Sequence, residues 1–314
     1  LGWMRMAGAG YLEVERISVC YGSTPVLHGL SLEVAEGAFV ALLGALLLLQ
    51  WSTREERHAE RLVLYCAAGI RAPVEDTIAE YEQYYAAQHG RPIRVEVEYA
   101  GSGTLLSRLL VEQRGDLYLA GDAAYIARAR DAGLVEETLE IASMAPVIAL
   151  AERHRGTVVT LRDLLEGDYR VAIGVPGSTA IGDATRTALE SLNAWERFEQ
   201  NVEVTKPTVN DLANDVKIGA VDAAIIWDVT ARQFGLEYVE DPALSSESAL
   251  VEIGVLNSTP NSAAALHFAR FLSAPEKGQK HFSGHHFAVR PGDRWADTPE
   301  VTFFSGALNR RALA

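Results

Sequence analysis

An α/β fold is predicted for the chain from about Leu62 onward, and three observations predict it. Short apolar segments of strand character alternate there with longer segments of helical periodicity, which is typical of sheets covered by helices. Several of the apolar segments end in small residues that lead directly into a helix. The 314 residues, of which 48% are hydrophobic, are enough for about two domains with substantial cores.

The helices are predicted from their apolar periodicity. The clearest is the segment 73–88, where Val74, Ile78, Tyr81 and Tyr85 recur at spacings of four, three and four and so share one buried face. Further helices are expected at 104–113, 123–132, 182–192, 210–218 and 262–273.

The strands are predicted from alternation or from short apolar runs. Strict alternation in Ile93–Tyr99 (IRVEVEY) predicts a strand with one buried face. Apolar runs predict the other strands at 62–67, 117–120, 146–151, 170–175, 223–227 and 250–256.

Two strand-to-helix junctions predict an anion-binding site. Leu62–Gly69 (LVLYCAAG) and Tyr99–Leu105 (YAGSGTL) each run from an apolar strand through small residues into a helix. Backbone N–H groups, the positive ends of two helices and the hydroxyl of Ser102 would then face a common space. This arrangement favours capture of a small oxyanion. Because no Ser-His-Asp order, H-E-x-x-H or paired-carboxylate motif accompanies it, we expect a binding protein without a cofactor and not an enzyme.

Net charge and cysteine content further restrict the possible partners and the class of protein. The net charge of −14 argues against a nucleic-acid partner. A buried anion is still compatible with it, because such an anion responds to nearby dipoles more than to distant, salt-screened carboxylates. The two cysteines, Cys20 and Cys66, do not indicate a disulfide framework. Cys66 is expected to pack as a small apolar residue rather than to act as a reactive thiol.

The first 45 residues differ in character from the rest. Strands are expected at 12–19, 26–34 and 37–44. This order resembles the start of an ABC-transporter ATPase, with Tyr21 at the position of the adenine-stacking aromatic residue. The phosphate loop of such an ATPase, G-x-x-x-x-G-K-[ST], does not follow Gly44, where the sequence reads ALLLLQWS. We interpret residues 1–45 as an ATPase-like fragment without a phosphate loop.

A hydrophobic segment and a charged segment follow. Ala38–Leu49 (AFVALLGALLLL) is short for a membrane span of about 20 residues but has the length of a signal-peptide core. Glu33 and Glu36 stand where basic residues would precede such a core, and no clean cleavage site follows. We expect a hydrophobic leader or anchor and a linker over 38–61, with an uncleaved membrane tether at 38–51 as one alternative.

Five segments resemble the periplasmic solute-binding proteins of ABC importers, and more narrowly their molybdate-binding branch. In chain order they are LVLYCAAGIRAPVEDTIAEYE, YAGSGTLLSRL, GDLYLAGDAAYIARARDAGLV, VAIGVPGSTAIGDATRTALE and GAVDAAIIWD. The resemblance extends from about Leu62 to Arg290. It implies the two-lobed fold of type II periplasmic binding proteins, in which each lobe is a mixed sheet flanked by helices. Lobe one would comprise 62–143 plus 250–290, lobe two would comprise 144–249, and the ligand cleft would lie between them.

The resemblance also implies the function. The protein would be an extracytoplasmic or periplasmic monomer that captures a tetrahedral oxyanion, molybdate or tungstate first, by neutral donors and lobe closure. It would then deliver the anion to an ABC permease and its ATPase. Sulfate, phosphate, ferric iron or an organic anion are the alternative ligands. A ligand-sensing domain is a further alternative, although no helix-turn-helix is visible before Leu62.

The site residues are implied by their match to that family. Ser102 falls at the hydroxyl donor, and Trp227 falls at a tyrosine whose hydroxyl reaches the anion. Ile181 and Val209 match positions that donate through the backbone. The full set of candidate ligand-binding residues is Gly69, Arg71, Ser102, Gly103, Ser178, Thr179, Ile181, Val209 and Trp227.

Several of these positions have two interpretations. Gly69 stands where the family usually has serine, and the loss of one donor to a buried dianion costs about 1.5–3 kcal/mol unless it is replaced. Arg71 either replaces that donor, since its guanidinium suits oxyanions, or faces solvent. Ser178 and Thr179 either add hydroxyls or only cap the following helix.

Other polar residues are expected to have structural roles. Asp228 either points away from the site as a helix cap or indicates a ligand that is cationic, protonated or metal-centred. Asp116 and Asp122 are expected to be caps. The histidines His281, His285 and His286 form either a surface cluster or a metal pair.

The C-terminal tail, 291–314, contains a possible repeat. Glu300–Arg310 (EVTFFSGALNR) resembles Arg61–Arg71 (RLVLYCAAGIR). It is either the start of a second binding domain or a plain strand.

Overall fold

The computed structural model describes residues 12–21, 24–34, 60–292 and 295, and the chain divides into two units at Ala59 and Glu60. In the first unit, β1 (Leu12–Tyr21) pairs antiparallel with β2 (Thr24–Val34), so the strands predicted at 12–19 and 26–34 are confirmed. The strand predicted at 37–44, the hydrophobic leader, the linker and the repeat at 300–310 lie outside the described residues. Among the described helices, none has the length and hydrophobicity that a membrane span requires.

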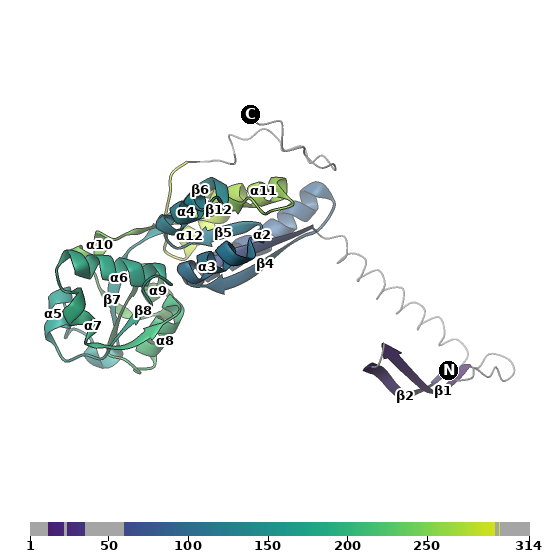
Figure 1. The fold of residues 1–314 in the computed structure, drawn as a ribbon, viewed down its shortest axis with the longest axis horizontal. Coiled ribbons are helices and arrows are strands. Elements are labelled where there is room, and N and C mark those ends of the chain that lie inside the picture. The colour runs from purple at the N-terminus through teal and green to yellow at the C-terminus, as the bar shows by residue number, and fades with distance from the viewer. Residues whose placement is uncertain (1–11, 22–23, 35–59, 293–294, 296–314) are drawn as a thin grey trace. The chain divides into compact units, whose positions relative to one another are not determined.

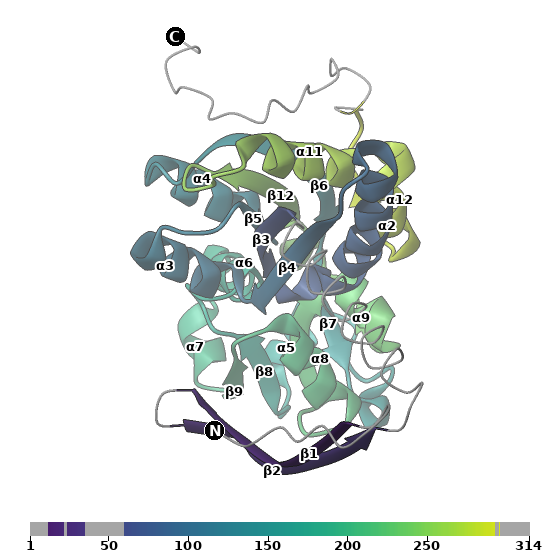
Figure 2. The same ribbon diagram turned by 90° about the vertical axis from the view of Figure 1, so that its right-hand side faces the viewer.

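Lobe one, as we use the term below, is a six-stranded sheet with its helices (Figures 1 and 2). Its strands lie in the order β13-β6-β12-β5-β3-β4. Strand β3 is parallel to β4 and β5, whereas β12 runs antiparallel to β5 and β6, and β13 antiparallel to β6. The bounds are β3 (Glu60–Ala67), β4 (Ile93–Ala100), β5 (Leu117–Ala120), β6 (Val135–Met144), β12 (Ala249–Leu256) and β13 (Ala288–Val289).

The helices of lobe one cover this sheet. They are the 3-10 turn η1 (Ala68–Ile70), α2 (Arg71–His89), α3 (Ser102–Glu112), α4 (Ala123–Asp131), α11 (Ser262–Ser273), the π-helical segment η3 (Pro275–Gln279) and α12 (Lys280–Gly284). Helix α2 packs on β4, and α11 packs on β12 and β6. Tyr81, Tyr85, Phe268 and Phe271 are fully buried where α2 and α11 meet. The buried face predicted for the segment 73–88 is thereby confirmed at its two tyrosines.

Lobe two, again as used below, is a five-stranded sheet with its helices. The strand order is β11-β7-β10-β8-β9. Strand β8 is parallel to β10 and β9, and β7 is antiparallel to β10 and β11. The bounds are β7 (Pro146–Leu150), β8 (Val171–Gly174), β9 (Val202–Lys206), β10 (Ala223–Trp227) and β11 (Glu237–Val239). The helices are η2 (Glu152–His154), α5 (Leu161–Glu166), α6 (Ala180–Ser191), α7 (Trp195–Glu199), α8 (Val209–Lys217), α9 (Asp228–Phe234) and α10 (Pro242–Ser245).

The predicted elements between residues 62 and 273 are all present, and their ends differ from the prediction by at most two residues. The differences at the helix starts matter for the site. Helices α3 and α6 begin at Ser102 and Ala180, two residues earlier than predicted, so small residues that looked like turn residues form the first helical turn. Cys66 is buried and unpaired in β3, which confirms its packing role.

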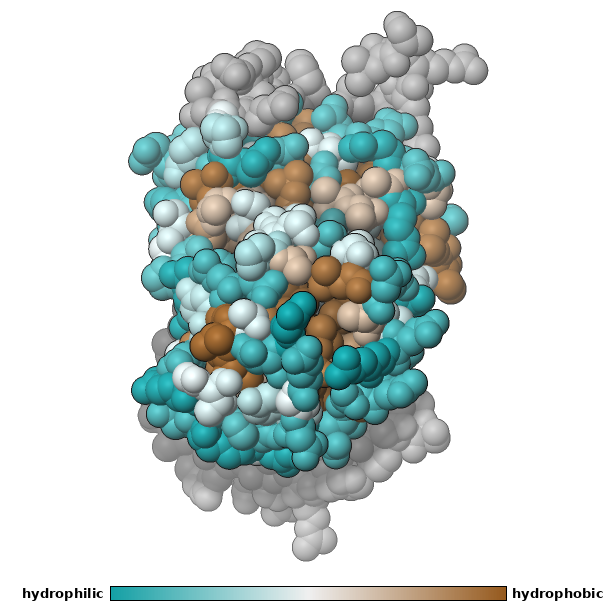
Figure 3. All heavy atoms as spheres, turned by 90° about the vertical axis from the view of Figure 1, so that its left-hand side faces the viewer, coloured by the Kyte–Doolittle hydropathy of each residue, from teal (hydrophilic) through white to brown (hydrophobic). Residues whose placement is uncertain are grey.

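In the face shown in Figure 3, most of the surface of the described residues is hydrophilic, and hydrophobic side chains form patches within it. The large hydrophobic side chains that are exposed among the described residues are Leu110, Val111, Val159, Leu192, Ile218 and Val289.

Candidate functional site

A cavity lies between lobe one and lobe two, where strands of both sheets end. Lobe one lines it with 67–70, 100–102, Gly121 and Met144, and lobe two lines it with 179–181, 208–209 and Trp227. The centres of water-sized molecules can occupy about 20 Å³ of the cavity. A single buried water needs roughly 10–15 Å³ by this measure, so there is room for a compact group of a few atoms.

Four helical segments begin at this cavity: η1, α3, α6 and α8. The first N–H groups of a helix have no acceptor within the helix. Among the described residues, the N–H groups of Gly69, Ser102, Ile181 and Val209 have no hydrogen-bond acceptor. The cavity therefore combines unpaired backbone donors and the positive ends of helix dipoles from both lobes, which favours an anion.

Ser102 is the first residue of α3 and is held in place at two atoms. Its Oγ accepts a hydrogen bond from the N–H of Gly121 at 3.1 Å, and its carbonyl oxygen accepts one from the hydroxyl of Tyr118 at 2.7 Å. Burial raises the pKa of Tyr118, so this phenol keeps its proton. The Ser102 hydroxyl proton has no acceptor among the described residues and is available to a ligand.

Trp227 is the last residue of β10, lines the cavity and is 2% exposed. An indole N–H can donate a hydrogen bond but cannot accept one. No acceptor for it occurs among the described residues. Trp227 and Ser102 thus bring side-chain donors from opposite lobes to one space.

Gly69 lines the cavity opposite Val209 and Trp227. A Cβ atom at Gly69 would lie 2.8 Å from Val209 Cγ1 and 3.6 Å from Trp227 Cδ1. A separation of 2.8 Å is shorter than real Cβ atoms show, so a side chain at Gly69 would clash with Val209. The space that a serine side chain would need is therefore occupied by Val209 from the other lobe.

Three of the candidate residues do not line the cavity: Arg71, Gly103 and Ser178. The side chain of Arg71 is about half exposed, with its guanidinium 4.2 Å from the Tyr99 ring and its Nε 3.9 Å from Glu75. The expectation that Arg71 replaces the missing serine donor is not met in this structure. Gly103 instead donates its N–H to the carbonyl oxygen of Ser178 at 3.0 Å, so these two residues connect the lobes.

The threonines at the cavity are helix caps. Thr179 Oγ1 accepts from the N–H of Gly182 and donates to the carbonyl of Val175, both at 3.1 Å. Its hydroxyl proton is thereby engaged, which favours the capping interpretation. Thr208 caps α8 in the same way, and sequence reasoning missed it, as it missed Gly121 and Met144.

No charged side chain lines the cavity formed by the described residues. Asp228, which immediately follows Trp227, points elsewhere: its Oδ1 accepts the N–H of Ala145 at 2.9 Å. Asp122 caps α4 through the N–H of Ala124, and Asp116 accepts the N–H of Val63 at 2.7 Å. These acidic residues thus have the structural roles expected for them, although Asp116 and Asp228 bind backbone outside the helices that they were expected to cap.

The C-terminal histidines face carboxylates and not one another. His281 pairs with Glu80 at 2.6 Å, and His285 pairs with Asp76 at 2.8 Å. Both carboxylates belong to α2, so the histidines connect α12 to α2. Within the part of the chain that the structure describes, no group of three or more His, Cys, Asp or Glu side chains is placed to hold a metal ion.

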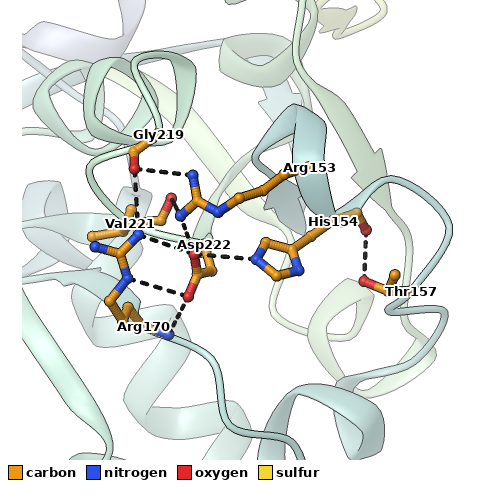
Figure 4. Close-up of polar contacts among 7 residues, drawn as sticks. All are labelled: Arg153, His154, Thr157, Arg170, Gly219, Val221 and Asp222. Atoms are coloured by element: carbon orange, nitrogen blue, oxygen red, sulfur yellow. Dashed lines mark hydrogen bonds and ion pairs between the residues drawn. The ribbon is translucent and has the colours of Figure 1, made fainter.

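Asp222 precedes β10 at the end opposite Trp227. Arg153, His154 and Arg170 surround its carboxylate (Figure 4). Asp222 accepts from Arg170 through Nε at 3.3 Å and Nη2 at 3.1 Å, and it also pairs with Arg153 and with His154 Nε2 at 3.2 Å. Burial opposes ionisation of Asp222, but the hydrogen bonds from Arg170 and Arg153 outweigh it and hold its pKa well below the usual range. These arginines are therefore neutralised within lobe two, far along the strand from the cavity.

The fold and the cavity define a two-lobed binding protein, and comparison with known proteins agrees. Residues 62–288 match the family described as bacterial extracellular solute-binding protein. A protein of Haemophilus influenzae described as a binding protein is 30% identical over 234 residues, covering 73% of this chain and 91% of that protein. The chain therefore belongs to the bacterial extracellular solute-binding proteins.

Solved structures show the same fold. The periplasmic molybdate-binding protein of Azotobacter vinelandii matches with a TM-score of 0.60 at 17% identity, covering 73% of this chain and 100% of that one. The sulfate-binding protein SubI of Mycobacterium tuberculosis matches with a TM-score of 0.59 at 19% identity, covering 75% of this chain and 88% of that one. The predicted type II periplasmic-binding-protein fold is thus confirmed.

Proposed function

We propose that this protein captures a tetrahedral oxyanion, with molybdate or tungstate as the preferred ligand, and delivers it to an ABC importer. One observation carries the proposal: the cavity between the lobes is lined by uncharged hydrogen-bond donors from both lobes and by no charged side chain. The permease and its ATPase are the implied partners. The place of action is outside the cytoplasm, in keeping with the family.

The donor set supports an anion over a cation. A bare cation such as ferric iron needs oxygen or nitrogen ligands that carry lone pairs, commonly from carboxylate or imidazole groups. The described residues hold no such cluster. Unpaired N–H groups at four helix starts instead provide partial positive charge, directed at a ligand that accepts hydrogen bonds.

The size of the cavity supports a compact ion over an organic anion. About 20 Å³ is open to the centres of water-sized molecules. A sugar or carboxylic-acid ligand would require the lobes to separate further than they do here. The main barrier to binding is then dehydration of the ion, which the donors of both lobes offset as the lobes close.

Discrimination among oxyanions follows from proton content and size. Phosphate carries a proton near neutral pH and needs an acceptor for it, whereas molybdate, tungstate and sulfate only accept. Ser102, Trp227 and the helix N–H groups are all donors, so a fully deprotonated dianion fits them best. Sulfate and molybdate carry equal charge, so the dimensions of the cavity decide which of the two binds more tightly.

The test is isothermal titration of the full chain with molybdate, tungstate, sulfate, phosphate and ferric iron. We expect molybdate and tungstate to bind most tightly. Ser102→Ala should weaken that binding by about ten- to a hundredfold, because a buried dianion loses one donor.

Ser107→Ala is the matched control, since its hydroxyl bonds to the Gly103 carbonyl within α3, outside the cavity lining. It should bind with unchanged affinity. Binding of ferric iron with no binding of any oxyanion would refute the proposal.

A further inference from the structure

The two lobes make direct contact through side chains outside the cavity. Tyr125 of α4 in lobe one donates its hydroxyl to Asp183 Oδ2 of α6 in lobe two, at 2.6 Å. Tyr125 is 1% exposed, and Arg128 lies over its ring at 5.0 Å. Burial and the charge of Asp183 raise the pKa of Tyr125, so the phenol keeps the proton that it donates.

The second oxygen of Asp183 holds the loop that carries the other lobe contact. Asp183 Oδ1 accepts the N–H of Gly177 at 2.5 Å. The next residue, Ser178, offers its carbonyl oxygen to the N–H groups of Gly103 and Thr104, at 3.0 and 3.2 Å. Asp183 therefore connects Tyr125 of lobe one to the loop that bonds the first turn of α3.

The backbones meet so closely at this point that a side chain would not fit. A Cβ atom at Gly103 would overlap the carbonyl oxygen of Gly177 and lie 2.9 Å from Ser178 Cα. The N-terminus of α3 therefore contributes both to the cavity and to the contact with lobe two. Its first residue, Ser102, lines the cavity, while the N–H groups of the next two residues bind lobe two.

We propose that the hydrogen bonds from Tyr125 to Asp183 and from Gly103 and Thr104 to Ser178 form a latch that holds the lobes closed. None of these five bonded residues lines the cavity. The latch stabilises the closed arrangement equally for every ligand. It sets affinity and the lifetime of the complex, and it leaves the choice among ligands to the cavity.

The consequence for ligand binding rests on the function proposed above, whereas the consequence for lobe closure does not. Breaking a partly buried hydrogen bond to a carboxylate shifts an equilibrium by about ten- to a hundredfold. Tyr125→Phe should therefore raise the dissociation constants of molybdate and tungstate by the same factor within that range, mainly through faster release.

Lobe closure is measured directly by the distance between two spin labels. Val111→Cys in lobe one and Ile218→Cys in lobe two are exposed positions, in a Cys20→Ser background with Cys66 buried. In the protein without added anion, Tyr125→Phe and Asp183→Asn should each shift the distances between the labels towards those of a more open arrangement of the lobes. The double variant should open no further than Asp183→Asn alone, because Asp183 is the partner to which the Tyr125 hydroxyl bonds in lobe two.

The matched control is Tyr81→Phe, which removes a hydroxyl bonded to His267 within lobe one. It should leave the distances and the affinities unchanged. If the wild type binds no oxyanion, the function proposed above fails and the label distances still decide the latch. Distances that do not change in Tyr125→Phe and Asp183→Asn overturn the latch.

Discussion

Single residues at the cavity differ in how far the sequence predicts their role. Ser102 and Trp227 line the cavity with donors that have no acceptor among the described residues, and their roles as ligand donors stay predictions. Arg71, at the start of α2, instead lies over Tyr99 and near Glu75 of the same helix, and it does not line the cavity. Gly69 leaves no room for a side chain at its position, because Val209 occupies the space beside it.

This packing predicts the outcome of restoring a serine. Gly69→Ser would place a Cβ atom 2.8 Å from Val209 Cγ1, so the lobes could not approach as they do now. Overpacking of this kind costs about 1–3 kcal/mol. We expect anion affinity to fall about ten- to a hundredfold, measured by titration. Adding Val209→Ala should recover the affinity.

The control for that comparison is Gly284→Ser, where a new Cβ atom meets nothing within 4 Å. It should bind like the wild type. Unchanged affinity in Gly69→Ser alone would show that Val209 does not occupy this space when the ligand is bound.

At the scale of helices and strands, sequence patterns predict the strongly periodic segments and miss segments of mixed pattern. The helix predicted at 73–88 is present as α2, because its apolar residues recur at helical spacing. Strand β6 was not predicted, because its sequence VEETLEIASM follows neither strict alternation nor an apolar run. It becomes a strand through pairing with β12 and β13, whose sequences lie more than a hundred residues further along the chain.

The contact between α2 and α11 predicts a pH dependence of stability. His267 of α11 shares a hydrogen bond with the hydroxyl of Tyr81 of α2 at 2.9 Å. Burial, followed by the nearby His89, Arg270 and Lys277, lowers the pKa of His267 to about 4. Between about pH 6.5 and 4 the unfolded chain therefore binds a proton that the folded chain does not, so stability falls as the pH falls.

The expected loss across that window is about 1–2 kcal/mol after allowance for partial exposure. Urea unfolding at pH 7 and pH 4.5 measures it. His267→Phe should flatten the dependence, while His286→Asn, which replaces an exposed histidine, should not. Equal pH dependence in His267→Phe and wild type would contradict the assignment.

The whole molecule places donors from two lobes around one space. The sheets come from separate stretches of chain, with the strands of one sheet within 60–144 and 249–289 and those of the other within 146–239. Ser102 and Trp227 are 125 positions apart in sequence yet line one cavity. A ligand bound there contacts both lobes, so binding stabilises both.

Amide hydrogen exchange tests this coupling. Saturating molybdate should slow exchange together in 68–70 and 102–104 of lobe one and in 180–182 and 208–210 of lobe two. The loop at 153–157, beside Asp222 at the far end of β10, should exchange as before. Protection confined to one lobe would contradict a ligand shared between them.

The sequence by itself determined the α/β class, the strands and helices with clear periodicity, and the small-residue junctions at which helices begin. These features depend on neighbouring residues, and local backbone and side-chain preferences are enough to specify them. Only the tertiary structure decided that Val209 fills the space beside Gly69, that Gly103 and Ser178 join the lobes, and that Arg71 lies outside the cavity. Those facts depend on distances between residues far apart in the chain, which packing sets and local pattern does not.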